Sequence, residues 1–167
     1  MSKALILGDV KQELAATRRI LERVPEEHFA WKPHEKSMRL GELATHIVNI
    51  TEWLPIILKE PVFDLAAAPI RREPLASRSA MLEVLDASAR ETEKLLDECD
   101  EQALEAEWTL RFGGNVMRTQ PRALGFRTFA LSHLIHHRAQ LGVYLRLLNV
   151  PLPGLYGPSA DDAGNSN

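Results

Sequence analysis

Four long segments, in which apolar residues recur at alternating spacings of three and four, constrain the fold more than any other feature of this chain. This spacing keeps one side of a helix apolar along its length. The predicted helices run from Leu7 to Val24, Leu40 to Ile57, Leu82 to Cys99 and Pro121 to Leu148. Each must bury its apolar side against another, so the sequence predicts an all-α fold, a four-helix bundle.

Prolines mark the boundaries of these segments. Pro25 is expected to end the first helix, and Pro151 to stop the last. Pro55 lies inside the second stripe, where a proline must kink the helix or end it early. Residues 59–73 are rich in proline and alanine and read as a long surface connection. Such a connection permits a crossover, so antiparallel and mixed bundles both remain open.

A different pattern precedes the last helix. Between Glu107 and Gln120, two short runs with β-branched and aromatic residues flank Gly113 and Gly114, which favour a tight turn. A short β-hairpin or an extended loop is predicted there. At the far end, residues 159–167 have nothing to bury. We therefore expect one domain, residues 1–158, followed by a mobile tail at 159–167.

Composition excludes several classes of protein. With a formal charge of −3, both signs interspersed and no basic cluster, the chain is not expected to bind nucleic acid. No run approaches the roughly 20 apolar residues of a membrane span. Its single cysteine, Cys99, cannot form an internal disulfide, which is consistent with a reducing compartment. A cytoplasmic protein without a membrane partner is the expectation.

Three histidines on apolar stripes carry the main functional signal. His133 and His137 are four residues apart in the last helix, so both rings can reach one ion, and His46 lies on the stripe of the second helix. Burying an unpaired imidazole costs about 1 to 3 kcal/mol, so three such residues require an explanation. A metal site formed by His46, His133 and His137 is predicted. The simpler alternative is three core histidines, each hydrogen-bonded to a neighbour.

The neighbours of these histidines refine the hypothesis. His136 also follows His133 at helical spacing, but it falls at the edge of the stripe, so His137 is the predicted ligand. In the H-E-x-x-H motif of metalloproteases a glutamate follows the first histidine, whereas Leu134 follows His133 here. A built-in hydrolytic base is therefore missing, and no catalytic residue can be assigned. An open site of three neutral imidazoles favours an anion, a thiolate or an activated water.

Other polar residues near the predicted site could either take part in it or lie in solvent. Side chains that could orient the histidine rings are Glu42, Asn49 and Gln140, although for Glu42 the sequence favours a solvated surface position. The arginines near the start of the last helix could be solvated or could meet an anionic substrate; they are Arg118, Arg122 and Arg127.

Two stretches together resemble a known family. These are VPEEHFAWKPHEKSMRLGELATHI and LSHLIHHRAQLGVYLRLLNVPLPGLYGPS, with an HRGQ-like motif at residues 137–140 in which Ala139 replaces the usual glycine. They resemble the DinB/YfiT-like family of metal-dependent proteins. The resemblance implies an up-down-down-up bundle, a homodimer, and zinc or nickel held by His46, His133 and His137. It also implies kinship with S-transferases and isomerases that use low-molecular-weight thiols.

The expected function is that of a metal-dependent enzyme of thiol S-transferase type, acting on a small molecule. A metal-dependent hydrolase is the first alternative. The second is a non-catalytic metal-binding module for stress response or interaction, in which a protein ligand would close the fourth position.

Overall fold

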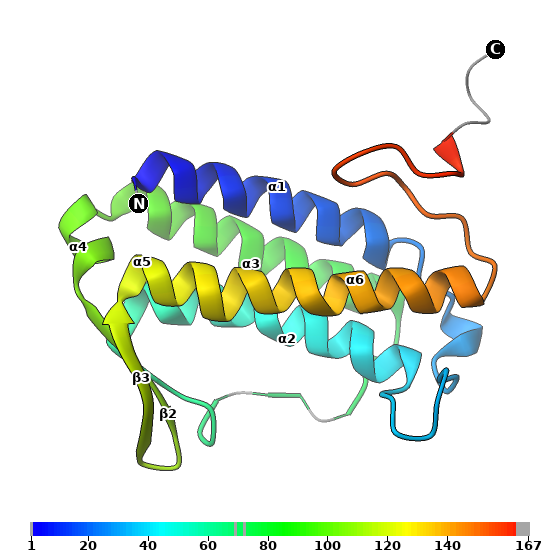
Figure 1. The fold of residues 1–167 in the computed structure, drawn as a ribbon, viewed down its shortest axis with the longest axis horizontal. Helices are drawn as coiled ribbons and strands as arrows, with labels where there is room; N and C mark the ends of the chain where they lie inside the picture. The colour runs from blue at the N-terminus through cyan, green and yellow to red at the C-terminus, as the bar shows by residue number, and fades with distance from the viewer. Residues whose placement is uncertain (1, 69, 72, 163–167) are drawn as a thin grey trace.

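The computed structural model describes residues 2–68, 70–71 and 73–162. Its long helices lie side by side (Figure 1). They are α1 (Lys3–Leu21), α2 (Leu40–Lys59), α3 (Arg78–Glu98) and a last continuous helix made of α5 (Arg122–Gly125), the π-helical segment η2 (Phe126–Leu131) and α6 (Ser132–Leu147). Two short elements, η1 (Glu26–His28) and α4 (Glu101–Glu105), lie in the connections. The predicted, mostly helical fold is confirmed.

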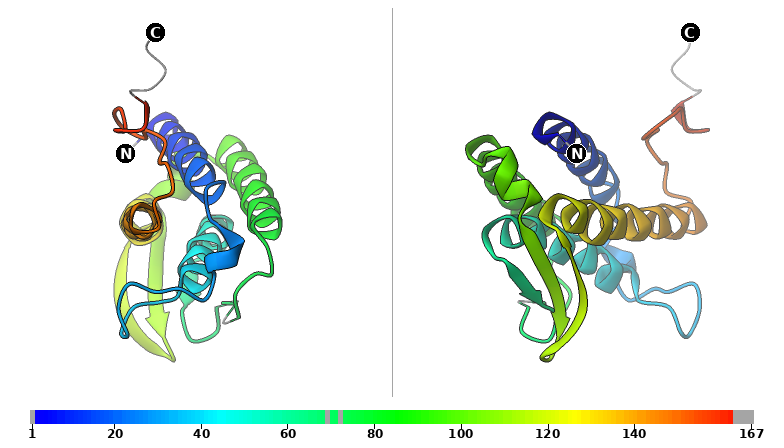
Figure 2. Two further views of the ribbon diagram at one scale, coloured as in Figure 1. Left: turned by 90° about the vertical axis from the view of Figure 1, so that its right-hand side faces the viewer. Right: turned by 60° about the vertical axis from the view of Figure 1, so that its left-hand side comes forward.

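The helices surround one apolar core. In Figure 1, α1 and α6 run in one direction and α2 and α3 in the other, and the end-on view of Figure 2 shows all four around a common centre. Helix α3 contacts both α1 and α2, and α6 contacts the same two helices from the other side. None of the described helices is long and apolar enough to cross a bilayer.

Helix α2 does not end early at Pro55, which was one of the two outcomes expected for this residue. The helix continues for another turn to Lys59. Proline removes only one backbone donor, whereas Leu54 and Ile57 on either side of it are completely buried. Burial of this last turn in the core outweighs the lost hydrogen bond.

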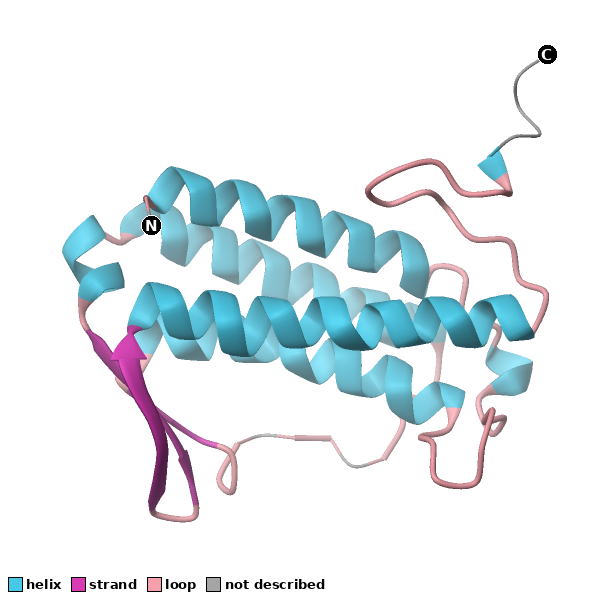
Figure 3. Ribbon diagram, in the orientation of Figure 1, coloured by secondary structure: helices cyan, strands magenta, loops and turns pink. Residues whose placement is uncertain are grey.

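A small sheet packs at one end of the helices (Figure 3). Strands β2 (Glu107–Phe112) and β3 (Asn115–Pro121) form the predicted hairpin, and Gly113 and Gly114 in its turn have φ angles of 55° and 87°. The sequence did not predict β1 (Val62–Asp64), which pairs in parallel with β2. Three residues in a proline-rich connection are too few to show a periodic pattern. This strand can be identified only from its pairing with β2 in the structure.

After α6 the chain folds back toward α1. Asn149, in the left-handed region with φ 59°, follows the end of the helix. Farther on, Asp161 accepts hydrogen bonds from Arg146 and from the backbone of Leu152. Residues 159–162, the start of the tail predicted to be mobile, therefore make defined contacts, while residues 163–167 lie outside the described part of the chain. The domain boundary at residue 158 stays a prediction.

Candidate metal centre

His46, His133 and His137 come together between α2 and α6. The Nε2 atom of His133 lies 3.4 Å from that of His46 and 2.9 Å from that of His137. One ligand atom from each ring can be chosen so that all three lie within 4.8 Å of one another. In a tetrahedral zinc site with bonds of about 2.0 to 2.1 Å, two nitrogen ligands are about 3.3 Å apart. The spacing of the rings therefore suits a group that could hold a metal ion.

The three rings are also in the protonation state that a metal ion requires. Burial, with a smaller contribution from the charge of His137, lowers the pKa of His46 from 6.5 to about 4. Burial and the neighbouring histidines lower the pKa of His133 to about 4 as well. The pKa of His137 is lowered too, chiefly by burial. At neutral pH these imidazoles are uncharged and their nitrogen lone pairs are free to bind.

A hydrogen bond orients the His137 ring. Its Nδ1 atom lies 2.7 Å from Oε1 of Gln140. Because an amide oxygen can only accept, the proton of the neutral ring is placed on Nδ1, and Nε2 presents its lone pair toward His133. Gln140 therefore has the orienting role that its spacing suggested.

Glu42 and Asn49, which the sequence also suggested as orienting residues, do not contact the histidine rings through hydrogen bonds. Glu42 accepts a hydrogen bond from the backbone of Arg39 and caps the start of α2. Asn49 bonds the backbone of Arg71, and so ties the connection after β1 to α2. Spacing along a helix placed both residues near His46, but their polar atoms satisfy backbone groups outside the histidine cluster.

His136 stays outside the cluster, as the stripe predicted. Its ring is exposed and meets the His137 ring edge-on at a centroid distance of 4.8 Å. Cys99 at the end of α3 is half-buried, and burial raises the pKa of its thiol, so it has no thiolate character at neutral pH.

An aromatic wall borders the histidines on the side of the sheet. The Trp53 ring lies 6.0 Å from the ring of His46 and 5.7 Å from that of His133. Phe129 stacks on Trp53 and lies 6.0 Å from His133. Phe129 was not among the residues predicted for the site, although its position one turn before His133 indicates that the two side chains lie on the same side of the helix. This side of the cluster is therefore lined by apolar rings.

The arginines near the start of the last helix separate into three environments. Arg122 is buried and donates to the carbonyl oxygens of Ile57 and Leu58 at the end of α2. Arg127 forms an exposed ion pair with Asp9. Within the described residues, neither Arg118 nor Arg122 forms an ion pair with a carboxylate, and Arg118 alone of the three also has no hydrogen-bond partner for its guanidinium.

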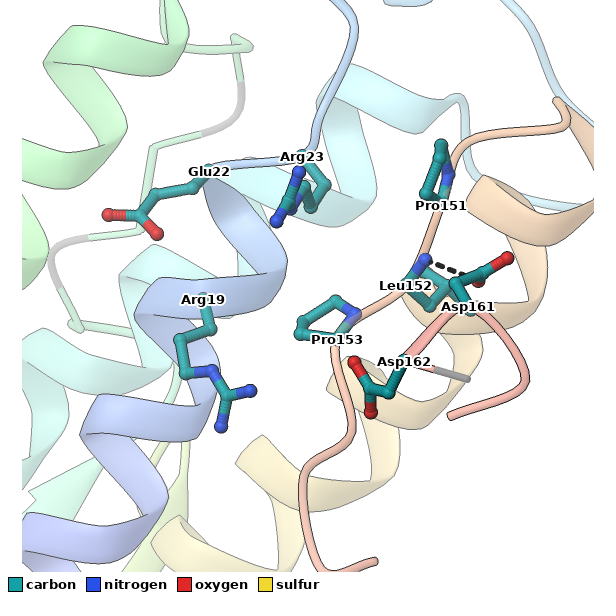
Figure 4. A pocket seen from close by; sticks show the side chains of 8 residues that line it. All are labelled: Arg19, Glu22, Arg23, Pro151, Leu152, Pro153, Asp161 and Asp162. Carbon is teal, nitrogen blue, oxygen red and sulfur yellow. Dashed lines mark hydrogen bonds between the residues drawn. The ribbon is translucent and has the colours of Figure 1, made fainter. Parts of the chain in front are cut away.

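A separate pocket lies between the end of α1 and the segment after α6 (Figure 4). It is lined by Arg19, Glu22, Arg23, Pro151, Leu152, Pro153, Asp161 and Asp162. None of the clustered histidines takes part in it. Its acidic side chains are occupied, since Asp161 pairs with Arg146 and Asp162 accepts from the backbone of Gly154 and Ser159.

Comparison with known proteins places the chain among DinB-like proteins. A model of the DinB family matches residues 1–165. The uncharacterized protein YjoA of Bacillus subtilis is 28% identical over 132 residues, which cover 78% of this chain and 80% of that protein.

Solved structures share the fold. The crystal structure of the DinB-like protein YjoA from Bacillus subtilis has a TM-score of 0.68 at 21% identity and covers 92% of this chain and 99% of its own. A DinB-like protein from Bacillus cereus has a TM-score of 0.71 at 18% identity, with 90% and 95% covered. Because the family model spans nearly the whole sequence, the chain belongs to the DinB family.

Proposed function

We propose that this protein is a metal-dependent enzyme of thiol S-transferase type, with zinc or nickel held by His46, His133 and His137. The observation that carries the proposal is the convergence of three neutral imidazole rings from two helices. A divalent ion held by such a set keeps its full charge and can lower the pKa of a coordinated thiol. The substrates would be a low-molecular-weight thiol and a small electrophile, and the protein would act as a cytoplasmic homodimer.

The residues of this chain would prepare the site in three ways. Burial keeps His46 and His133 neutral. Gln140 holds the proton of His137 on Nδ1, which leaves Nε2 free. Trp53 and Phe129 form an apolar wall that would exclude water from a reacting thiolate.

The composition of the cluster supports a transferase over the two alternatives. Among the residues that the structure describes, no carboxylate or cysteine joins the three histidines. A hydrolase would need a base from elsewhere to activate water. A purely structural metal site would need a fourth protein ligand to close it.

Metal content is the first test. Protein prepared without a histidine tag should contain about one zinc or nickel ion per chain by inductively coupled plasma mass spectrometry. His46→Ala and His137→Ala should lose the ion. His136→Ala, which removes an exposed imidazole next to the cluster, is the matched control and should retain it. Wild-type protein that cannot be loaded with either metal would rule out the metalloenzyme.

Turnover is the second test. The loaded protein should accelerate the reaction of cysteine, glutathione or bacillithiol with monobromobimane, and His46→Ala should not. In the cobalt-substituted protein, addition of the thiol should produce a sulfur-to-metal charge-transfer band. Metal-dependent cleavage of esters or amides without a thiol would select the hydrolase instead. Metal binding without any turnover would select the non-catalytic module.

A further inference from the structure

A pocket of about 190 Å³ lies between the hairpin and the first half of the last helix, next to the aromatic wall. Its lining combines apolar and polar side chains: Leu110, Met117, Arg118, Gln120, Thr128 and Phe129. Phe129 belongs both to this pocket and to the wall, where its ring lies 6.0 Å from that of His133. A molecule in the pocket would therefore be one aromatic ring away from the histidine cluster.

A β-bulge shapes one side of this pocket. Leu110 of β2 is paired with Arg118 of β3, but the next residue, Arg111, is paired with Val116. Met117 is thus an extra residue in β3. In a regular strand Met117 and Arg118 would point to opposite faces, whereas here both line the pocket. Bulges commonly re-aim side chains in this way beside functional sites.

A π-helical segment shapes the other side. Segment η2 interrupts the last helix at Phe126–Leu131, immediately before the turn that carries His133. Thr128 and Phe129 belong to this segment and face the pocket, and the Thr128 hydroxyl accepts a hydrogen bond from Gln120 across it. Single π-helical turns are rare and are frequent at functional sites. Two independent backbone irregularities therefore deliver side chains to the same small volume.

The charge of the pocket is positive. No acidic residue lines it, and Arg118 has no carboxylate within ion-pair distance among the described residues. Leu110, Met117 and Phe129 provide an apolar surface beside this guanidinium. Such an arrangement matches a small molecule with an apolar body and an anionic end, since a guanidinium binds a carboxylate through two parallel hydrogen bonds.

We propose that this pocket is a substrate subsite, in which Arg118 binds the carboxylate of a small molecule whose apolar body packs on Leu110, Met117 and Phe129. The subsite would hold the electrophilic substrate beside His133. Only the identification of the bound molecule as a substrate rests on the proposed function. The binding of an apolar carboxylate rests on the pocket itself.

Two probes of the same shape test the charge requirement. Hydrocinnamate carries a phenyl ring and a carboxylate, and hydrocinnamamide replaces the carboxylate by an uncharged amide. Binding is followed by backbone amide NMR shifts of the full chain. The carboxylate is expected to bind about tenfold more tightly than the amide, with shifts concentrated in β3 and η2. Equal binding of the two probes would overturn the proposal, as would shifts concentrated near Arg19 and Arg23 in the pocket of Figure 4.

Variants of the hairpin assign the effect to one residue. Arg118→Gln should reduce hydrocinnamate binding to the level of the amide. Arg111→Gln removes the same charge from the neighbouring strand outside the pocket and should leave the preference unchanged. Phe129→Leu should weaken both probes to the same extent, because it alters the apolar wall and not the charge. A preference that survives Arg118→Gln, or probe binding unaffected by Phe129→Leu, would contradict the assignment.

Measurements with and without metal separate this proposal from the proposed function. Carboxylate binding that depends on Arg118 in protein unable to bind zinc or nickel would support the pocket and refute the metalloenzyme. Metal binding and thiol turnover without any preference for the carboxylate would support the metalloenzyme and refute the pocket.

Discussion

Arg138 and Glu13 form a buried ion pair between α6 and α1, with Nη2 of the arginine 2.6 Å from Oε2 of the glutamate. Their side chains are only 2% and 10% exposed. The same guanidinium donates to the backbone carbonyl of Glu13, and the Tyr156 hydroxyl donates to the carboxylate from the segment after α6. The residue after His137 is thereby anchored to α1 while His137 itself faces α2.

We predict that Glu13→Ala lowers the free energy of unfolding by about 3 to 5 kcal/mol, because it leaves a buried guanidinium without its counter-ion. Urea denaturation followed by circular dichroism measures the change. Arg146→Gln breaks the more exposed pair with Asp161 and should cost about 1 kcal/mol or less. Equal decreases in the free energy of unfolding of the two variants would show that the buried pair stabilises the fold no more than the exposed one.

The metal-free protein should become less stable as the pH falls from 6.5 toward 4. His46 and His133 have folded pKa values of about 4, compared with 6.5 for an ordinary histidine. Between these values the unfolded chain takes up protons that the folded chain does not, so acidification favours unfolding. The contribution of neutral His46 and His133 to the free energy of unfolding is complete above pH 6.5 and is lost as the pH falls through 4.

Chemical denaturation in the presence of a chelator, repeated across this pH range, tests the prediction. The double variant His46→Gln, His133→Gln is the control, since it keeps every carboxylate that titrates near pH 4. Its stability should fall less steeply than that of the wild type. Parallel curves would mean that the two imidazoles do not have depressed pKa values.

Gln140→Ala should weaken metal binding about 10- to 100-fold without unfolding the protein. Loss of the amide oxygen frees the His137 ring to rotate and to carry its proton on Nε2. Competition with a chromophoric chelator measures the affinity. Gln120→Ala, on the hairpin, is the matched control and should bind metal like the wild type. An unchanged affinity in Gln140→Ala would remove this residue from the metal centre.

Gly125→Ala should destabilise the fold by about 1 to 3 kcal/mol, because a Cβ atom there would overlap the ring of Trp108. The Trp108 ring contacts Phe129, so thermal unfolding is best combined with tryptophan fluorescence. Gly8→Ala in α1, where a Cβ meets nothing within 4 Å, should be neutral or stabilising by about 0.5 to 1 kcal/mol. Comparable behaviour of the two variants would argue against close packing at Gly125.

Local patterns in the sequence were sufficient for the helices and the hairpin. The alternation of three and four residues identifies each helix without knowledge of its partners. Gly113 and Gly114 mark the turn because few other residues adopt positive φ angles. The His133 and His137 pair is also local, since four residues make about one helical turn.

Only the tertiary structure decided which of these distant elements come into contact. His46 is 87 residues from His133, and their approach to 3.4 Å depends on how α2 and α6 are rotated and aligned, which the periodicity of either helix does not specify. The same holds for β1 beside β2, for Arg122 on the carbonyls at the end of α2, and for Glu13 beside Arg138. Sequence by itself determined the four long helices, the hairpin and the spacing of His133 and His137, because these follow from neighbours along the chain. The pocket beside Phe129 and the buried charges arise from long-range packing, whose energy is distributed over contacts that no local pattern encodes.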